Sequence, residues 1–151
     1  MNKYISIVHL DGPDKTGKDT IRRELIKRSD GNILVICRSY ISQLVYADIY
    51  ERDVNSGFFI DNMKKAQNIG HIFIYLECEK EQLRYRFEKH NEKHLKFEDY
   101  DKHKKCFDMY VEYLKGLGIK IKTISTNTLI ENSVKNILNY IETINNGTAI
   151  N

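Results

Sequence analysis

The most chemically informative part of the chain is a short stretch near its start, Gly12–Thr20, which reads Gly-Pro-Asp-Lys-Thr-Gly-Lys-Asp-Thr. Its Gly-x4-Gly-Lys spacing is typical of a loop whose main-chain N–H groups surround phosphate oxygens while the lysine supplies positive charge. An apolar run over residues 4–10 precedes the loop, and an amphipathic stretch begins at Lys18. Because phosphates bind at helix N-termini, this arrangement predicts a nucleotide phosphate site. Its expected binding residues are Gly12, Asp14, Lys15, Thr16, Gly17, Lys18, Asp19 and Thr20.

Oxygen-bearing side chains flank the loop on both sides. Asp19 and Thr20 follow Lys18, and Asp11 precedes Gly12. Carboxylate and hydroxyl oxygens are the hard ligands that Mg²⁺ prefers. We therefore expect Asp19, Thr20 and Asp11 to position a Mg²⁺ ion, directly or through water, beside ATP.

The remaining sequence alternates between strand and helix patterns. Strands are predicted over residues 4–10, 33–37, 71–77 and 119–124; helices are predicted over 18–29, 40–53, 58–68, 79–90 and 98–114, with a last helix from the capping box Thr128-x-x-Glu131 to residue 144. Such alternation predicts a parallel sheet covered by helices on both faces, in a single domain over residues 1–151. Ligands of such sheets bind at the carboxyl ends of the strands, where Asp11, Arg38 and Glu77 or Cys78 fall.

Composition narrows the class of protein. The net charge of +3 suits small anions and is too small to indicate a nucleic-acid binder. Three cysteines without a CxxC pair fit a reducing cytoplasm. No signal peptide and no apolar run near 20 residues is present, so we expect a cytoplasmic protein without membrane contact.

Four segments together resemble the thymidylate kinase family. The loop from Asp11 to Thr20 is similar to the family's phosphate loop, and Cys37 to Tyr46 is similar to its Asp-Arg-aromatic-x-x-Ser-x-x-x-Tyr motif. The stretch from Ile74 to Arg86 resembles the strand that leads into the family's arginine-bearing lid, and residues 99–114 resemble the helix after it. The chain also resembles small kinase-like proteins of bacterial viruses. The resemblance implies a P-loop NTPase fold, a three-layer α/β/α sandwich around a mostly parallel sheet of about four strands.

The resemblance also implies roles for side chains outside the loop. Arg38 would bind the acceptor phosphate and the transferred group, and Arg84 and Arg86 would close over the triphosphate from a lid at about residues 86–98. Lys18, Arg38, Arg84 and Arg86 are thus the expected catalytic residues. The acceptor nucleotide would be bound by Asp14, Arg38, Ser42, Gln43 and Tyr46.

This sequence departs from the family pattern at three places. Asp19 stands where the family has the Ser or Thr that binds Mg²⁺, and Cys37 replaces the acid before Arg38. The family's second strand and the helices after it are absent, which puts base selection in doubt. His90, His94 and His103 are weak candidates for a zinc site, because lysines crowd them. The basic run at residues 102–105 is interleaved with acids, so nucleic-acid contact is not favoured.

We therefore expect ATP-dependent phosphoryl transfer to a (deoxy)nucleoside monophosphate. The alternatives are a deoxynucleoside kinase, a nucleotide-binding protein without catalysis and, more weakly, a kinase of nucleic-acid ends. The apolar helix over residues 40–53 is a candidate homodimer surface.

Overall fold

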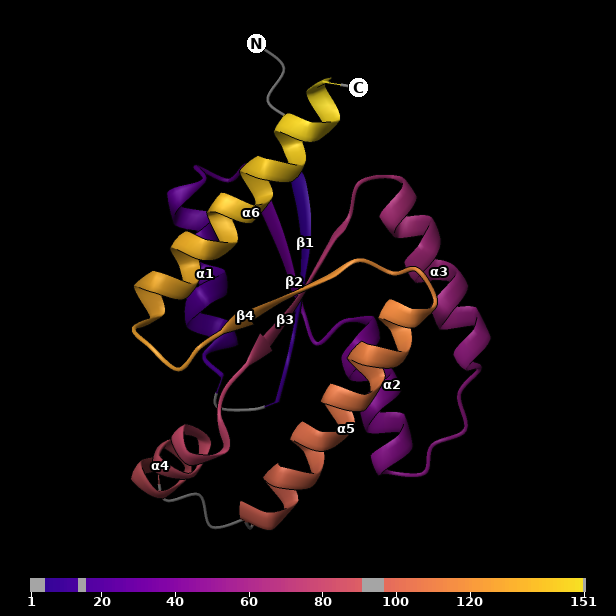
Figure 1. Cartoon of the computed structure of the whole chain (residues 1–151), viewed down its shortest axis with the longest axis vertical. Coiled ribbons are helices and arrows are strands. Elements are labelled where there is room, and N and C mark those ends of the chain that lie inside the picture. The colour runs from indigo at the N-terminus through magenta and orange to yellow at the C-terminus, as the bar shows by residue number, and fades with distance from the viewer. Residues whose placement is uncertain (1–4, 14–15, 91–96, 151) are drawn as a thin grey trace.

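The fold is a four-stranded parallel sheet between two layers of helices, seen in a computed structural model that describes residues 5–13, 16–90 and 97–150 (Figure 1). The strands are β1 (Ser6–Asp11), β2 (Ile33–Cys37), β3 (Ile72–Glu77) and β4 (Ile121–Ser125). The helices are α1 (Lys18–Arg28), α2 (Tyr40–Ile49), α3 (Ser56–Asn68), α4 (Lys80–His90), α5 (Phe97–Gly116) and α6 (Ile130–Ile150). The predicted α/β/α fold with four parallel strands is confirmed.

The strand order β2-β1-β3-β4 places the phosphate-loop strand β1 in the interior of the sheet. Leu10 of β1 pairs with Cys37 of β2 on one side and with Ile74 of β3 on the other. Apolar side chains fill β1 and β3 because both faces of these interior strands are covered, whereas Leu34 and Ile36 leave one face of the edge strand β2 exposed. The carboxyl ends of β1, β2 and β3 therefore lie side by side, as the sequence predicts.

Each face of the sheet has its own apolar core. On one face, α1 and α6 cover Val8 and Leu10 of β1, together with Ile74 of β3. On the other face, α2, α3 and α5 cover Phe73 and Tyr75 of β3. Alternate residues of one strand thus serve opposite layers, as the two-residue repeat of a strand requires.

Two helices end more than two residues away from their predicted ends. The second helix ends at Ile49 instead of residue 53, because Glu51 takes a left-handed backbone conformation, with φ of 52°. The last helix begins at Ile130, after the expected cap at Thr128, and continues to Ile150 instead of ending at residue 144. Because α2 ends early, the chain turns at Glu51 and places the side chain of Arg52 in the lining of a pocket described below.

None of the helices within the described part of the chain is long and apolar enough to cross a membrane.

Candidate functional site

The phosphate loop connects β1 to α1, and Gly12 is required at its start by close packing. A Cβ at Gly12 would lie 2.5 Å from the carbonyl oxygen of Leu76 on β3, well inside the contact distance of real side chains. At the other end, Gly17 has φ of 85° and directly precedes α1. The two glycines thus let the backbone pass under β3 and turn into the helix.

Lys18 lies across the loop instead of extending into solvent. Its ammonium donates hydrogen bonds to the carbonyl oxygens of Gly12 at 2.6 Å and Pro13 at 2.8 Å, and the side chain is buried. The hydroxyl of Thr16 donates to Pro13 at 2.8 Å. Together with the N-terminus of α1, this arrangement concentrates positive potential at the loop, an environment that favours a negatively charged group. Asp14 and Lys15, predicted to bind nucleotide, lie outside the described residues.

Asp11 joins the phosphate-loop strand to α2. Its Oδ1 accepts hydrogen bonds from the backbone N–H groups of Ser39 at 2.9 Å and Ser42 at 3.1 Å, and from the Ser42 hydroxyl at 2.6 Å. Asp11 therefore caps α2, and its burial raises the pKa of the carboxyl group, against the opposing effect of these hydrogen bonds. Its Oδ2 is also buried, and no described residue hydrogen-bonds to it.

Arg38 immediately follows β2 and has an uncommon backbone conformation. Its φ is 56°, in the left-handed region, and its N–H donates to the carbonyl of Leu10 at 3.2 Å. A non-glycine residue in this region costs about 1–3 kcal/mol and persists only where its surroundings hold it. Such strain is commonly found at functional sites, and the exposed Arg38 side chain enters a pocket.

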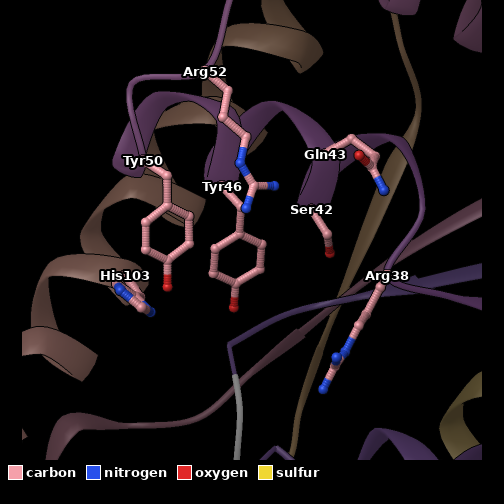
Figure 2. Close-up of a pocket in the computed structure, with 7 residues that line it drawn as sticks. All are labelled: Arg38, Ser42, Gln43, Tyr46, Tyr50, Arg52 and His103. Carbon is pink, nitrogen blue, oxygen red and sulfur yellow. The ribbon is translucent and has the colours of Figure 1, made fainter. Parts of the chain in front are cut away.

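This pocket, the Arg38 pocket, has a volume of about 300 Å³ (Figure 2). Its lining residues are Arg38, Ser42, Gln43, Tyr46, Tyr50, Arg52 and His103. The rings of Tyr46 and Tyr50 stack at 6.1 Å, with their hydroxyl groups directed to the same side, and Arg38 extends beside them from the end of β2. The predicted residues Arg38, Ser42, Gln43 and Tyr46 are therefore brought together, although the hydroxyl of Ser42 is bonded to Asp11.

Three residues of the Arg38 pocket were missed by sequence reasoning. Tyr50 and Arg52 follow the early end of α2, and the Arg52 guanidinium lies 5.3 Å from the centre of the Tyr50 ring. His103 comes from α5 and contacts the edge of Tyr46, with ring centres 5.6 Å apart. His103 thus belongs to this pocket, and the His90 side chain and His94 lie outside what the structure describes.

A second pocket, the Arg86 pocket, includes the loop residues Thr16 and Gly17 and has a volume of about 350 Å³. It is lined by Thr16, Gly17, Gln82, Tyr85, Arg86, Lys89 and Ile130. Arg86 is held there by hydrogen bonds to the hydroxyl and carbonyl oxygens of Thr126. Arg84 instead lies over the ring of Phe97, at 4.6 Å. The structure therefore brings Arg86 to the loop and Arg84 to the start of α5, and residues 91–96 of the expected lid lie outside the described part.

Comparison with known proteins identifies the family of the chain. The family model for thymidylate kinase matches residues 26–137, well over half of the chain. The chain belongs to the thymidylate kinase family. The match includes Arg38 and Arg86 but begins after the phosphate loop, whose assignment rests on its own sequence and geometry.

One solved structure shares the fold over most of both chains. It is the YorR protein of Bacillus subtilis in complex with phosphorylated GDP, with a TM-score of 0.77 and 15% sequence identity. The similarity covers 91% of this chain and 96% of that one. No curated protein sequence matches the chain.

Two of the three departures from the family pattern, Asp19 and Cys37, lie on the neighbouring elements α1 and β2. Asp19 is exposed in the first turn of α1, and Cys37 ends β2 with its side chain packed on the α1 side of the sheet. Burial raises the pKa of the Cys37 thiol, and the nearby Asp19 carboxylate raises it further. Within the described residues no group of three His, Cys, Asp or Glu side chains could hold a metal by itself. A carboxylate and a hydroxyl at the start of α1 nevertheless fit Mg²⁺, which usually takes one or two protein oxygens together with substrate phosphates.

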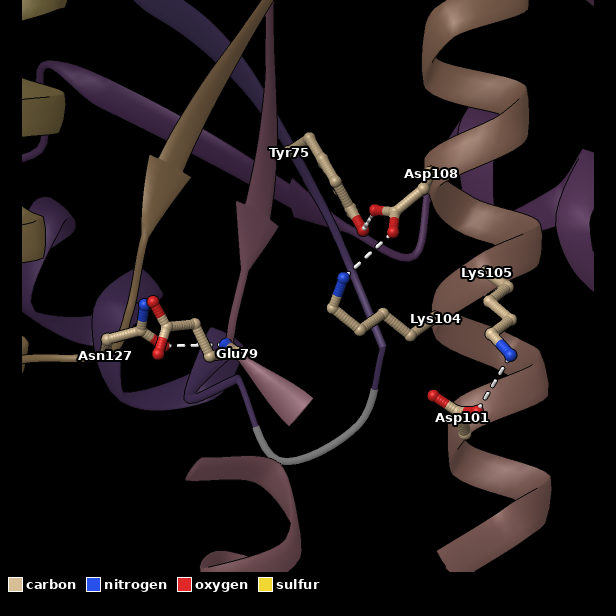
Figure 3. A network of polar contacts seen from close by, with 7 residues as sticks. All are labelled: Tyr75, Glu79, Asp101, Lys104, Lys105, Asp108 and Asn127. Carbon is tan, nitrogen blue, oxygen red and sulfur yellow. Dashed lines mark hydrogen bonds and ion pairs between the residues drawn. The ribbon is translucent and has the colours of Figure 1, made fainter. Parts of the chain in front are cut away.

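A polar network fixes α5 against the sheet (Figure 3). The hydroxyl of Tyr75 on β3 donates to Asp108 at 2.6 Å, and Lys104 binds the other oxygen of the same carboxylate at 2.9 Å. Burial and the Asp108 carboxylate raise the pKa of Tyr75 far above its ordinary value, so its hydroxyl remains a donor. This contact lies less than two helical turns from His103 and so sets where His103 meets the pocket.

Proposed function

We propose that the protein transfers a phosphoryl group from ATP to a (deoxy)nucleoside monophosphate. The observation that carries this proposal is the charge of the Arg38 pocket. Arg38, Arg52 and His103 contribute cationic or donor groups, and none of the seven residues that line it is a carboxylate. A pocket of this kind suits an acceptor that is already anionic.

The same observation distinguishes a monophosphate from a nucleoside acceptor. A nucleoside hydroxyl is a poor nucleophile until a general base removes its proton, a role that an aspartate fills in protein kinases. Asp11 bonds to Ser42 of this pocket, but its Oδ1 already accepts three hydrogen bonds in capping α2. A phosphate oxygen needs no such base, so a monophosphate is the acceptor favoured over a deoxynucleoside.

In the proposed reaction the protein acts by positioning and charge stabilisation. The loop amides and Lys18 hold the donor phosphates, and the Arg86 pocket receives the rest of the donor. Mg²⁺ bound with the nucleotide would neutralise phosphate charge, with Asp19 and Thr20 as its protein ligands. Arg38 binds the acceptor phosphate and stabilises the charge that develops on the transferred group.

The test is a coupled assay with ATP, Mg²⁺ and a panel of nucleoside monophosphates, run in parallel with the matching nucleosides and with 5′-hydroxyl oligonucleotides. Guanine nucleotides belong in the panel because the Bacillus subtilis neighbour carries phosphorylated GDP. We expect turnover with at least one monophosphate, reduced about 10²-fold or more by Lys18→Ala and by Arg38→Ala.

Turnover with nucleosides alone would favour the deoxynucleoside kinase. ATP binding in calorimetry without transfer to any acceptor would favour a binding protein that does not catalyse. Either result would overturn the proposal.

A further inference from the structure

His9 is a polar residue in the middle of β1, an interior strand with five buried residues out of six. Its side chain is only 2% exposed and lies against the ring of Phe73, with ring centres 4.7 Å apart. The neighbouring positions Val8 and Leu10 are apolar and face the opposite core. An imidazole is costly to bury unless both ring nitrogens find partners. The hydrogen-bond partners of the two ring nitrogens therefore indicate what His9 does.

The two ring nitrogens of His9 are both occupied. Nδ1 lies 2.6 Å from the hydroxyl oxygen of Ser39, and Nε2 lies 2.8 Å from Nδ1 of His71, just before β3. Burial and the neighbouring His71 lower the pKa of His9 to about 4, so the ring is neutral near pH 7. A neutral ring with two fixed neighbours has one orientation, and that orientation holds the Ser39 hydroxyl.

Ser39 is diverted from the role its position usually gives it. It is the N-cap residue of α2, where a serine hydroxyl commonly accepts a hydrogen bond from the first turn, but its side chain makes no such bond here. Asp11 caps the helix instead, by accepting from the Ser39 and Ser42 N–H groups. The hydroxyl is thereby left for His9. Two side chains of β1 thus hold Ser39. Asp11 accepts a hydrogen bond from its backbone N–H, and His9 bonds to its hydroxyl group.

Ser39 directly follows Arg38, whose left-handed backbone directs its side chain into the Arg38 pocket. We propose that His9 is a positioning residue, which acts through Ser39 to keep the Arg38 guanidinium in the orientation that binds the acceptor phosphate. The proposal rests on the proposed function of Arg38. His9 does not line the Arg38 pocket, and none of its contacts with described residues is to the loop, so its effect would reach the substrate through Arg38.

The test compares two substitutions of His9. His9→Phe keeps an aromatic ring against Phe73 but removes the bond to Ser39, and His9→Asn keeps a hydrogen-bonding atom near the position of Nδ1. We expect His9→Phe to raise the KM and the calorimetric Kd for the nucleoside monophosphate about tenfold, with the KM for ATP unchanged within twofold. His9→Asn should restore both values to within about threefold of the wild type.

A double-mutant cycle shows whether the effect passes through Arg38. In an Arg38→Ala background, His9→Phe should have no further effect on acceptor affinity, because the group that it positions is gone. Val8→Ala is the matched control. It removes two methyl groups at the position before His9, from the apolar core on the opposite face of the sheet. It should lower the midpoint of thermal unfolding without a change in acceptor affinity.

The outcomes separate this inference from the proposed function. If Arg38→Ala leaves acceptor affinity unchanged, the proposed role of Arg38 fails, and the present inference fails with it. If Arg38→Ala weakens the acceptor but His9→Phe does not, or does so equally with and without Arg38, only the role of His9 is overturned. Should His9→Phe not fold, Ser39→Ala removes the same bond from its other end, and the same cycle and the same expected changes apply to it.

Discussion

The cap that Asp11 places on α2 makes a quantitative prediction about stability. Asp11→Ala removes the acceptor of three hydrogen bonds, two of which come from the buried Ser42. A buried donor left without a partner costs about 1–3 kcal/mol, and the half-buried Ser39 N–H can turn to water at smaller cost. We therefore expect Asp11→Ala to lower the free energy of unfolding by about 2–4 kcal/mol.

Asp11→Asn is the matched variant, because its Oδ1 can accept the same three hydrogen bonds. The substitution also removes a carboxylate that is fully buried and whose Oδ2 no described residue contacts. The lost charge-assisted bonds and the relieved burial oppose each other, so the net change near pH 7 should lie within about 1 kcal/mol.

The difference between wild type and Asp11→Asn should depend on pH in a defined direction. The pKa of Asp11 is raised in the folded state above the ordinary 3.8, so the folded protein binds this proton more readily than the unfolded chain. Wild-type stability therefore falls, relative to the variant, as pH rises from 3.8 through the folded-state pKa, and the difference is constant at higher pH.

Urea unfolding of the three proteins from pH 4 to pH 8, without nucleotide or metal, measures both effects. The reasoning would be refuted if Asp11→Asn were as destabilising as Asp11→Ala, or if the wild-type and Asp11→Asn curves stayed parallel across the pH range.

Three further substitutions test other parts of the structure. Gly12→Ala should abolish ATP binding in calorimetry and cost about 1–3 kcal/mol in urea unfolding, because its Cβ meets the carbonyl of Leu76 at 2.5 Å; Gly147→Ala, whose Cβ meets nothing within 4 Å, should bind ATP normally. Asp19→Ser should weaken Mg²⁺ binding in the presence of ATP and tighten binding of metal-free ATP, since a carboxylate attracts the ion and repels the triphosphate; equal shifts in both would contradict its role as a ligand. Tyr75→Phe should lower the free energy of unfolding by about 1–2 kcal/mol through the lost bond to the α5 carboxylate, and an unchanged urea midpoint would show that the bond contributes nothing.

Much of the fold could be predicted because its signals are local. The phosphate loop, the stop after α1 at Asp30 and Gly31, and the alternation of strands and helices are all encoded within short windows of sequence. The lining positions Ser42 and Tyr46 followed from the resemblance of residues 37–46 to a short family motif. Each of these features is determined by residues that are close together in the sequence, so a short window is enough to predict it.

The missed residues depend on long-range packing. Glu51 ends α2 although it is not a glycine, so nothing local indicated that Arg52 would turn toward the pocket. His103 lies in a charged stretch typical of a solvated face, and only the packing of α5 on α2 brings it to Tyr46. His9 looked like one more residue of a buried strand, because its partners Ser39 and His71 are 30 and 62 residues away.

The separation of the two apolar cores by the sheet has a consequence for how damage to the protein would show itself. The layer of α1 and α6 supports the loop and, through Ile130, one wall of the Arg86 pocket, and the layer of α2, α3 and α5 supports the Arg38 pocket. Under the proposed assignment, each layer serves one of the two nucleotides. Heat-sensitive variants of this protein should therefore fall into two groups. Substitutions on one side of the sheet should weaken binding of the donor nucleotide, and substitutions on the other side should weaken binding of the acceptor.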